Sequence, residues 1–251
     1  METAQKADCE LKKESSQEKN ALKTSKKEVQ AKIKQGKRKE RHVSFGHEVW
    51  YHICWSVVMI LSRVLFRTRY RGAKNIPSKG PVLVVSNHQS YLDPVTIGSG
   101  VWRRMNYLAK KGLFTFKPFA LLIASVDAIP LDQDGLGFQG IKETLRRLRN
   151  NEMVLIFPEG MRSLDGKLNP FRKGYVNIAV KTKSVIVPTA TAGAWEAFPP
   201  HKKFPSFFKP AVRIEYGKPI MPEEAAAMSE EELHQLIEER VTEIFNRINK
   251  R

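Results

Sequence analysis

From Pro81 onward, short apolar runs alternate with longer amphipathic stretches, and this alternation limits the possible fold more than any other feature of the chain. The strand-like runs are Val82–Ser86, Met105–Ala109, Ala128–Leu131, Met153–Phe157, Val185–Thr191 and Val212–Tyr216. The helix-like stretches are Pro94–Val101, Pro118–Val126, Phe138–Arg149 and Arg172–Lys181. Strands that alternate with helices are typical of a parallel sheet. We therefore predict an α/β domain whose mostly parallel central sheet is flanked by helices.

The end of the chain predicts the clearest helix. Ser229 and Glu232 have the spacing of a capping box, in which each side chain bonds the other residue's backbone N–H. The apolar residues that follow recur every three to four positions: Leu233, Leu236, Ile237, Val241, Ile244, Phe245 and Ile248. By contrast, Ala197–Pro210 is rich in Pro, Phe and Lys, which predicts an irregular loop or lid that could meet lipid.

The charge of the chain favours an anionic partner. Its 251 residues carry a formal net charge of +17, which suits nucleic acid, a membrane surface or a phosphate-bearing ligand. Residues 1–41 hold 13 Lys and Arg against 7 Asp and Glu, with few large apolar side chains. Such a segment cannot bury enough surface to fold alone, so we predict a disordered basic tail. Residues 42–251 hold 30 basic and 19 acidic residues, so the folded part is expected to be basic too.

The most apolar stretch, Val49 to Phe66, predicts a helix at a membrane. Its 18 residues reach the lower limit for a membrane span. On a helix, His52, Ser56 and Arg63 would share one narrow stripe and apolar side chains would cover the rest. This composition suits shallow insertion into a bilayer, and it also suits packing under a soluble domain. We expect a tail at 1–41, an anchoring helix at 42–68 and an α/β domain at 69–251.

The cysteines and histidines give no metal pattern. Cys9 and Cys54 cannot make a disulfide framework, and no Cys/His spacing fits zinc. His42, His47 and His52 recur every five residues, which scatters them around a helix. We expect neither a metal nor a redox cofactor.

One pair of residues that could carry chemistry follows the strand-like run Val82–Ser86. Ligands of open α/β sheets bind at the carboxyl ends of strands, which is where His88 falls. An imidazole can take a proton from a hydroxyl near neutral pH. Asp93 could accept a hydrogen bond from the other ring nitrogen and fix the tautomer. A histidine held for structural reasons is the alternative.

A second polar cluster follows the run Met153–Phe157. Arg162 can form a forked contact with a phosphate, or it can pair with Glu159 and brace the loop. Further on, Arg172 and Lys173 stand just before a helix, whose N-terminal amides favour anions. The alternative for these two is a solvated basic turn.

Taken together, these segments resemble a known family. Asn87-His88-Gln89-Ser90-Tyr91-Leu92-Asp93 resembles the NHxxxxD motif of the lysophosphatidic acid acyltransferase (PlsC-like) family of glycerolipid acyltransferases. Phe157–Ser163 resembles its FPEGTRS block, with Met161 in place of threonine. Val187–Ala190 is similar to the downstream proline block, and Ala128–Gln133 falls where the family has a strand ending in an arginine. The four segments keep the family's order and spacing over about residues 70–220.

The resemblance implies an enzyme of glycerolipid synthesis, with residues 69–251 as its acyltransferase domain. A fatty acyl group would pass from acyl-CoA or acyl-carrier protein to a lysophospholipid hydroxyl, most commonly that of 1-acyl-glycerol-3-phosphate, giving phosphatidic acid. By the same resemblance, His88 is the general base, Asp93 orients it, and no acyl-enzyme forms. The residues expected at the substrates are Asn87, Glu159, Gly160, Arg162, Ser163, Lys173 and Gln133. No cofactor beyond the co-substrate is implied.

The implied partners are a membrane lipid surface, the acyl donor and the lysophospholipid acceptor, and no nucleic acid is expected. Both substrates are amphiphiles, so the active site should lie at a bilayer surface. Basic residues of the tail could add about 1 kcal/mol each near anionic lipid. We therefore expect a monotopic membrane enzyme whose active site faces the cytoplasm.

Sequence features also suggest three other classes of protein. Gly135–Gly140 is a literal GxGxxG with Glu159 beyond it, which would suit an NAD(P)-dependent oxidoreductase. However, residues 132–134 separate the strand from the first glycine, and their two carboxylates would repel a pyrophosphate. A nucleic-acid-binding protein is supported by charge alone, without a recognised motif. A serine hydrolase lacks its GxSxG turn, since Ser99 lies only in a Gly-Ser-Gly.

Gln133 stands where the resembled family has an arginine, and its substitution can be tested. Glutamine cannot make the charge-assisted fork that a phosphate prefers, so another cation compensates or the acceptor lacks a phosphate. We expect Gln133→Arg to raise acyl transfer to phosphate-headed lysolipids, measured with labelled acyl-CoA across a panel of lysolipids. A variant that gains nothing on phosphate-headed lipids, relative to neutral ones, would contradict the assignment of this position.

Overall fold

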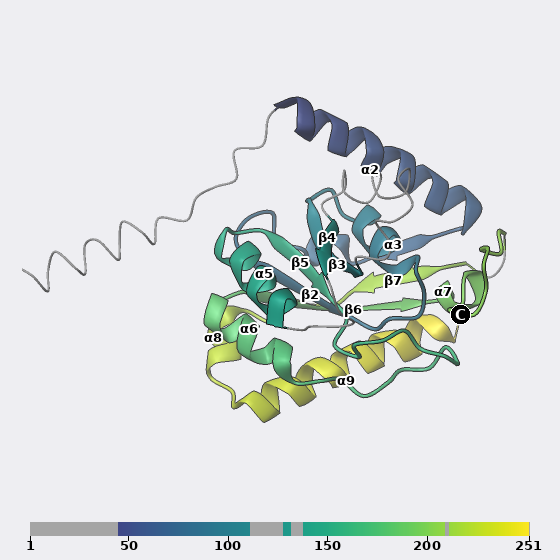
Figure 1. Cartoon of the computed structure of the whole chain (residues 1–251). Helices are drawn as coiled ribbons and strands as arrows, with labels where there is room; N and C mark the ends of the chain where they lie inside the picture. The colour runs from purple at the N-terminus through teal and green to yellow at the C-terminus, as the bar shows by residue number, and fades with distance from the viewer. Residues whose placement is uncertain (1–44, 111–127, 132–137, 209–210, 251) are drawn as a thin grey trace, which may run out of the picture. The chain divides into compact units, whose positions relative to one another are not determined.

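Seven strands form one sheet in the order β1-β7-β6-β2-β5-β3-β4 (Figure 1). The computed structural model describes residues 45–110, 128–131, 138–208 and 211–250. The strands are β1 (Arg69–Arg71), β2 (Val82–Ser86), β3 (Met105–Lys110), β4 (Ala128–Leu131), β5 (Met153–Ile156), β6 (Val185–Ala192) and β7 (Arg213–Tyr216). Within this sheet every neighbouring pair is parallel except β6 and β7, which are antiparallel. The prediction of a mostly parallel central sheet is confirmed.

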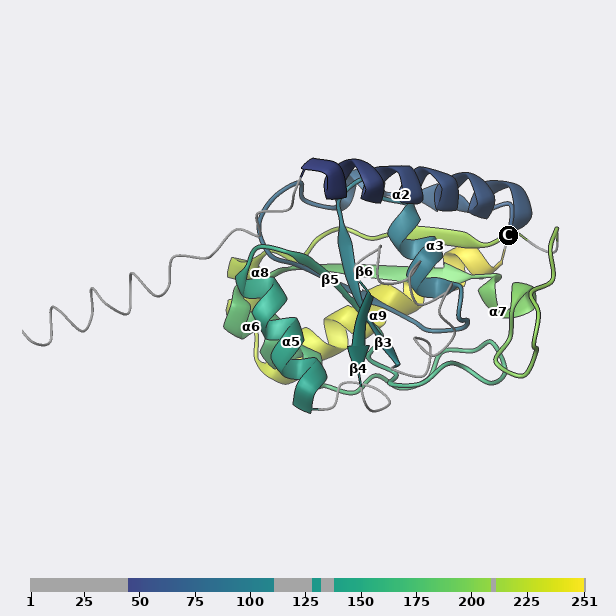
Figure 2. The same cartoon turned by 45° about the horizontal axis from the view of Figure 1, so that its top comes forward.

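Helices cover both faces of the sheet. They are α2 (Phe45–Leu65), the 3₁₀ turn η1 (Ala73–Asn75), α3 (Asp93–Ser99), α5 (Phe138–Arg149), α6 (Gly174–Thr182), α7 (Ala194–Ala197), α8 (Pro222–Ala226) and α9 (Glu230–Asn249). α2 and α3 lie over one face, and α5, α6 and α9 lie over the other (Figures 1 and 2). Both faces of the central strands are therefore removed from water.

The central strand β2 shows what this layering does to side chains. All of its residues are buried, because a strand of a doubly covered sheet has no face in water. Leu83 and Val85 join one apolar cluster with α6 and α9. Val82 and Val84 point the other way, into a cluster that includes Ile97 of α3. Because successive side chains of a strand point to opposite faces, β2 contributes to both apolar clusters.

The predicted capping box of α9 is confirmed. The backbone N–H of Glu232 donates to Ser229 Oγ at 3.2 Å, and the N–H of Ser229 donates to Glu232 Oε2 at 2.8 Å. The apolar face that follows packs on the sheet and is buried at Leu233, Ile237, Val241, Ile244, Phe245 and Ile248.

Four elements were missed by the sequence patterns: the short turn η1, β1, α7 and α8. β1 is Arg-Tyr-Arg, which has no apolar run, and it is a strand because its backbone pairs with β7. α7 and α8 are only 4 and 5 residues long, too short to show a helical period. The expected irregular segment is observed at residues 198–208. The predicted tail 1–41, the predicted helix Pro118–Val126 and Gln133 lie outside the described residues, and the three-part division of the chain stays a prediction.

α2 turns an apolar face toward solvent. Its outward side chains are each 42–55% exposed: Val49, Trp50, Ile53, Val57, Ile60, Leu61 and Val64. On the opposite side Tyr51 and Cys54 are buried, and Trp55 Nε1 donates to the carbonyl of Val101 at 2.8 Å. Within the described residues, one segment, Glu48–Leu65, is long and apolar enough to cross a membrane by length and composition.

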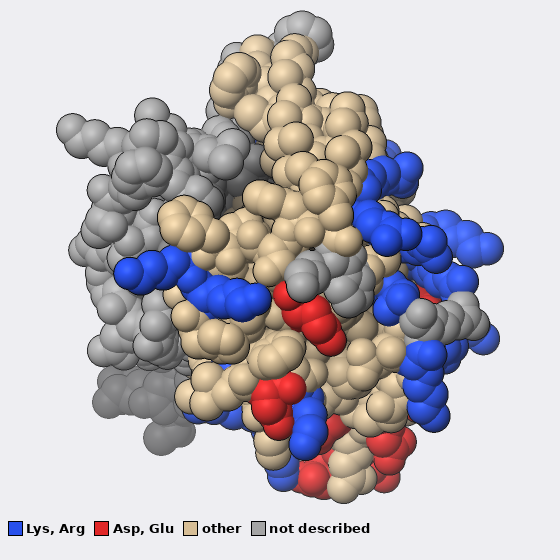
Figure 3. Space-filling view, turned by 90° about the vertical axis from the view of Figure 1, so that its right-hand side faces the viewer, with Lys and Arg blue, Asp and Glu red and all other residues tan. Residues whose placement is uncertain are grey.

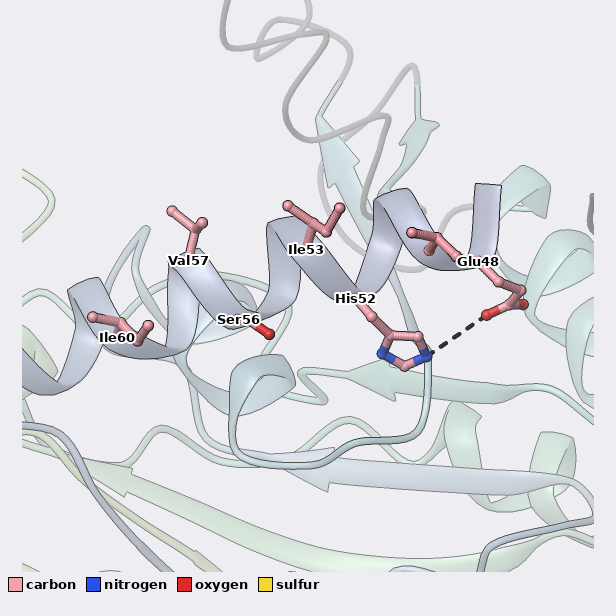
Figure 4. Close-up of a pocket in the computed structure, with 7 residues that line it drawn as sticks. Glu48, His52, Ile53, Ser56, Val57 and Ile60 are labelled. Atoms are coloured by element: carbon pink, nitrogen blue, oxygen red, sulfur yellow. Dashed lines mark ion pairs between the residues drawn. The ribbon is translucent and has the colours of Figure 1, made fainter. Parts of the chain in front are cut away.

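A shallow open groove of about 560 Å³ runs along α2. Figure 4 shows Ile53, Val57 and Ile60 along the helix, and the ion pair of His52 Nε2 with Glu48 Oε2 at 3.7 Å. All of its described lining residues belong to α2, so this groove is separate from the segments that follow β2 and β5.

Candidate active site

The two polar segments expected to carry chemistry meet at one edge of the sheet. β2 and β5 are adjacent and parallel, with Val85 opposite Ile156. Their carboxyl ends therefore lie side by side, and the residues that follow each strand come into contact. β6 flanks β2 on its other side, with Ser86 opposite Thr189.

His88 and Asp93 form a hydrogen-bonded pair. His88 Nδ1 lies 2.8 Å from Asp93 Oδ2, and the Asp93 side chain is fully buried. The same carboxylate oxygen accepts the backbone N–H groups of Gln89 at 2.6 Å and Ser90 at 2.7 Å. Backbone N–H groups of the turn before α3 thus fix the Asp93 carboxylate, and the carboxylate in turn fixes the orientation of the His88 imidazole. With Nδ1 turned toward Asp93, Nε2 of the partly exposed imidazole is the nitrogen left for a substrate.

The segment after β5 makes three contacts with His88. The Phe157 ring stacks on the imidazole, with centroids 4.0 Å apart and planes 13° apart. The N–H of His88 donates to Glu159 Oε1 at 2.8 Å, and its carbonyl accepts the N–H of Ser163 at 2.8 Å. The FPEG-like block therefore positions the imidazole that the other motif supplies.

Asn87 joins the end of β2 to β6. Its Nδ2 donates to the carbonyl of Thr191 at 3.0 Å, and its Oδ1 accepts the N–H of Thr191 at 2.9 Å. The side chain is buried, so both ends of the amide are used inside the protein. Asn87 thereby anchors the backbone next to His88, while its predicted contact with substrate stays a prediction.

Glu159 is a buried carboxyl engaged at both oxygens. Beyond its bond to His88, Oε2 accepts the backbone N–H of Asn169 at 3.1 Å and Asn169 Nδ2 at 2.8 Å. Burial raises the pKa of Glu159 to about 7, the hydrogen bonds oppose that rise, and the nearby charge of Asp93 adds to it. Glu159 does brace its loop, through His88 and Asn169. The sequence carried no signal for Asn169, which stands ten residues after Glu159 in an irregular stretch.

Arg162 lies over the loop that carries His88. Its Cζ is 3.5 Å from the centroid of the Tyr91 ring, a cation–π contact. Its Nη1 is buried and has no hydrogen-bond partner among the described residues. Gly160, with φ of 75°, supplies the left-handed turn between Glu159 and Arg162.

Lys173 lies apart from this group. Lys173, just before α6, pairs with Glu231 at the start of α9. Gln133 is outside the described residues, so its expected role is untested. Among the described residues, no group of three or more His, Cys, Asp or Glu side chains could hold a metal ion.

Comparison with known proteins gives the class. Residues 67–192 match the acyltransferase family. The chain is 24% identical over 205 residues to the 1-acyl-sn-glycerol-3-phosphate acyltransferase of Bacillus subtilis, covering 80% of this chain and 99% of that one. It is 32% identical over 148 residues to the chloroplastic 1-acyl-sn-glycerol-3-phosphate acyltransferase BAT2 of Brassica napus, covering 58% of this chain and 42% of that one. The chain thus spans nearly all of the bacterial relative and less than half of the plant one.

A solved structure shares the fold. The crystal structure of the 1-acyl-sn-glycerophosphate acyltransferase PlsC from Thermotoga maritima aligns with a TM-score of 0.64 at 24% identity, over 81% of this chain and 83% of that one. The family match covers half of the chain and includes both polar segments. The chain therefore belongs to the acyltransferase family, and it is an enzyme of the O-acyltransferase class. This membership favours acyl transfer over the oxidoreductase, nucleic-acid-binding and hydrolase alternatives.

Asn169 gives a prediction about pH. Its amide donates to the ionised form of Glu159, so Asn169→Leu should raise the pKa of Glu159 above about 7. The carboxyl would then take up its proton at higher pH and hold the His88 N–H less firmly. When the pH is lowered, the variant should lose activity earlier than the unmodified protein, at a pH roughly half to one unit higher. The size of this shift follows because one lost hydrogen bond is worth about 1 kcal/mol. The measurement is the transfer rate against pH.

Asn177→Leu is the matched control for this experiment. Asn177 Nδ2 donates to Glu230 Oε1 at 2.8 Å on the surface, so its loss should leave the pH profile in place. If Asn169→Leu also keeps the original profile, the ionisation of Glu159 does not govern the His88 loop.

Proposed function

We propose that the protein transfers a fatty acyl group from a thioester to the free hydroxyl of 1-acyl-glycerol-3-phosphate, forming phosphatidic acid. The observation that carries the proposal is the 2.8 Å contact of His88 Nδ1 with the buried Asp93, at the carboxyl edge of the sheet. The names of the bacterial and plant relatives support this acceptor. The donor would be acyl-CoA or acyl-carrier protein, which present the same thioester.

The proposed reaction is a direct displacement. Nε2 of His88 takes the proton of the acceptor hydroxyl while its oxygen attacks the thioester carbonyl. The new C–O bond forms, the C–S bond breaks, and the leaving thiolate takes the proton back from the imidazolium. Asp93 stabilises the imidazolium, and no acyl-enzyme forms. Positioned base catalysis accounts for roughly 10²–10⁴ in rate, and alignment of the two substrates contributes much of the remainder.

A second candidate is transfer by the same machinery to an acceptor without a phosphate, motivated by Gln133 in place of arginine. Arg162 favours the phosphate acceptor. Its buried Nη1 lacks a partner among the described residues, and a guanidinium suits the planar, forked contact of a phosphate.

We also propose that the enzyme is attached to one face of a membrane, with its active site on the cytoplasmic side. The exposed apolar face of α2 supports this, and the loop at 204–208 extends it. The N–H of Phe208 donates to the carbonyl of Leu65 at 2.8 Å, and Phe207 contacts Phe66 with ring centroids 5.6 Å apart. Figure 3 shows the right-hand side of the molecule in Figure 1, where Lys and Arg side chains lie on either side of a largely uncharged surface that also carries some Asp and Glu side chains. Such a surface suits anionic lipid.

The mechanism predicts that His88→Ala lowers transfer roughly 10²–10⁴-fold, because the general base is lost. Labelled acyl-CoA and 1-acyl-glycerol-3-phosphate provide the assay. His201→Ala, on an exposed histidine, is the matched control and should retain the full rate. Turnover of His88→Ala at the rate of the unmodified protein would refute the mechanism.

The attachment predicts that Ile53→Asn combined with Ile60→Asn weakens binding to vesicles of phosphatidylglycerol and phosphatidylcholine. Each exposed isoleucine should contribute about 1 kcal/mol or more when buried in lipid, so the double variant should bind at least about tenfold less. The measurement is flotation of the full chain with the vesicles. Val180→Asn combined with Met221→Asn removes two exposed apolar residues elsewhere and should float normally. Equal flotation of both double variants would overturn the role of α2.

A further inference from the structure

The segment that follows α7 exposes large apolar side chains to solvent. It runs without helix or strand from Phe198 to Phe208, and we refer to it as the phenylalanine segment. Phe204 is 80% exposed, Phe208 is 65% exposed and Phe207 is 47% exposed. Exposed apolar residues grouped in this way mark a surface that meets a membrane or another protein.

Phe208 has a backbone conformation that a phenylalanine rarely adopts. Its φ is 58°, in the left-handed region, where a bulky side chain costs more free energy than Asn or Gly. Its N–H donates to the carbonyl of Leu65 at 2.8 Å, which holds it beside the C-terminal end of α2 (Figures 1 and 2). The turn by itself favours Asn or Gly, so a phenylalanine here points to a use for its exposed ring outside the fold.

The surroundings of these rings fit a bilayer better than a protein partner. The phenylalanine segment contains Lys202 and Lys203, both exposed, and no Asp or Glu. Phe207 contacts Phe66, the residue after α2, so the rings continue the exposed apolar face of that helix. Aromatic rings that insert below the headgroups, with lysines at the level of anionic phosphates, are typical of a lipid-binding surface.

The phenylalanine segment is also bonded to the loop of the His88–Asp93 pair. Ser90 Oγ donates to the carbonyl of Phe198 at 2.7 Å. The backbone N–H of Ser90 is one of the two that bind Asp93 Oδ2. Ser90 therefore joins the segment to the carboxylate that orients His88.

We propose that the phenylalanine segment inserts into an anionic bilayer and that this insertion activates the enzyme. Lipid around Phe204 and Phe208 restrains the segment, so that Phe198 holds Ser90 and Ser90 holds the Asp93 carboxylate. A lipid surface shifts the enzyme toward its active geometry because it binds that geometry better. The inference rests on the proposed acyl transfer and gives the membrane a role in the rate, in addition to its role in attachment.

Lipid contact is tested without any turnover. The full chain carries an NBD label at Phe204→Cys in a Cys9→Ser background, and Cys54 is buried. Vesicles of phosphatidylglycerol and phosphatidylcholine should shift the emission to shorter wavelength, because the label leaves water. The matched control is the same label at Val180→Cys, on α6 over the other face of the sheet, and its emission should not shift. Unshifted emission at position 204 would overturn the inference.

Activation is tested with Phe204→Asn combined with Phe208→Asn. Asn tolerates the left-handed φ at 208, so this variant should unfold at the same temperature as the unmodified protein or a higher one. The assay measures kcat with saturating 1-hexanoyl-glycerol-3-phosphate and hexanoyl-CoA, and with enough vesicles to bind all of the enzyme. Vesicles should raise kcat of the unmodified protein roughly tenfold, which burial of two rings in lipid can supply. They should raise kcat of the variant less than about twofold.

Val180→Asn combined with Met221→Asn is the matched control and should be stimulated as the unmodified protein is. Equal stimulation of the Phe204→Asn, Phe208→Asn variant, or no stimulation of the unmodified protein, would overturn the inference. Transfer by the unmodified protein with no emission shift at position 204 would leave the proposed reaction in place and remove the inference. An emission shift without any transfer would remove the proposed reaction, and the activation with it, while the lipid contact would stand.

Discussion

The hydrogen bond between His88 and Asp93 sets the arrangement of the surrounding loops. A buried carboxylate is costly unless it is paired, and Asp93 is fully buried. One of its oxygens therefore gathers the imidazole and two backbone N–H groups from residues 89 and 90, which forces a tight turn between β2 and α3. The imidazole is oriented by the same turn whose backbone N–H groups bind Oδ2 of the carboxylate. The orientation of the imidazole and the local folding of this turn therefore depend on the same contacts.

The register of the sheet then brings in the second loop. β2 and β5 end at the same level, so Glu159 reaches the backbone of His88 and Phe157 stacks on its ring. Burial keeps the pKa of Glu159 at about 7, which makes the brace sensitive to protons in the range where an imidazole also works. His88 is therefore held by a carboxyl group whose pKa depends on its burial.

The basic side chains near these loops differ in whether they are paired with a carboxylate. Where the fold needs a cation for itself, it pairs the cation, as it does for Arg147 and Lys173. Arg162 is instead held against the face of the Tyr91 ring, and its buried Nη1 has no hydrogen-bond partner among the described residues. A parallel contrast exists among apolar residues. The core strands bury every side chain, whereas α2 exposes a row of them that a bilayer could cover.

Most of the longer helices and strands, and the two polar segments, could be predicted from the sequence alone. Short apolar runs predicted β2 and β4 at their observed bounds, because a strand covered on both faces is apolar along its length. An amphipathic stretch predicted α5 at its observed bounds. The contacts that complete the site were decided only by the tertiary structure. Asn87 meets Thr191 across 104 residues, Glu159 meets Asn169 in an irregular stretch, and Arg172 rather than Lys173 lies against Gly160. No local period encodes these contacts. They arise because strands distant in sequence become neighbours in the sheet, and because neighbouring side chains on one turn point to different partners.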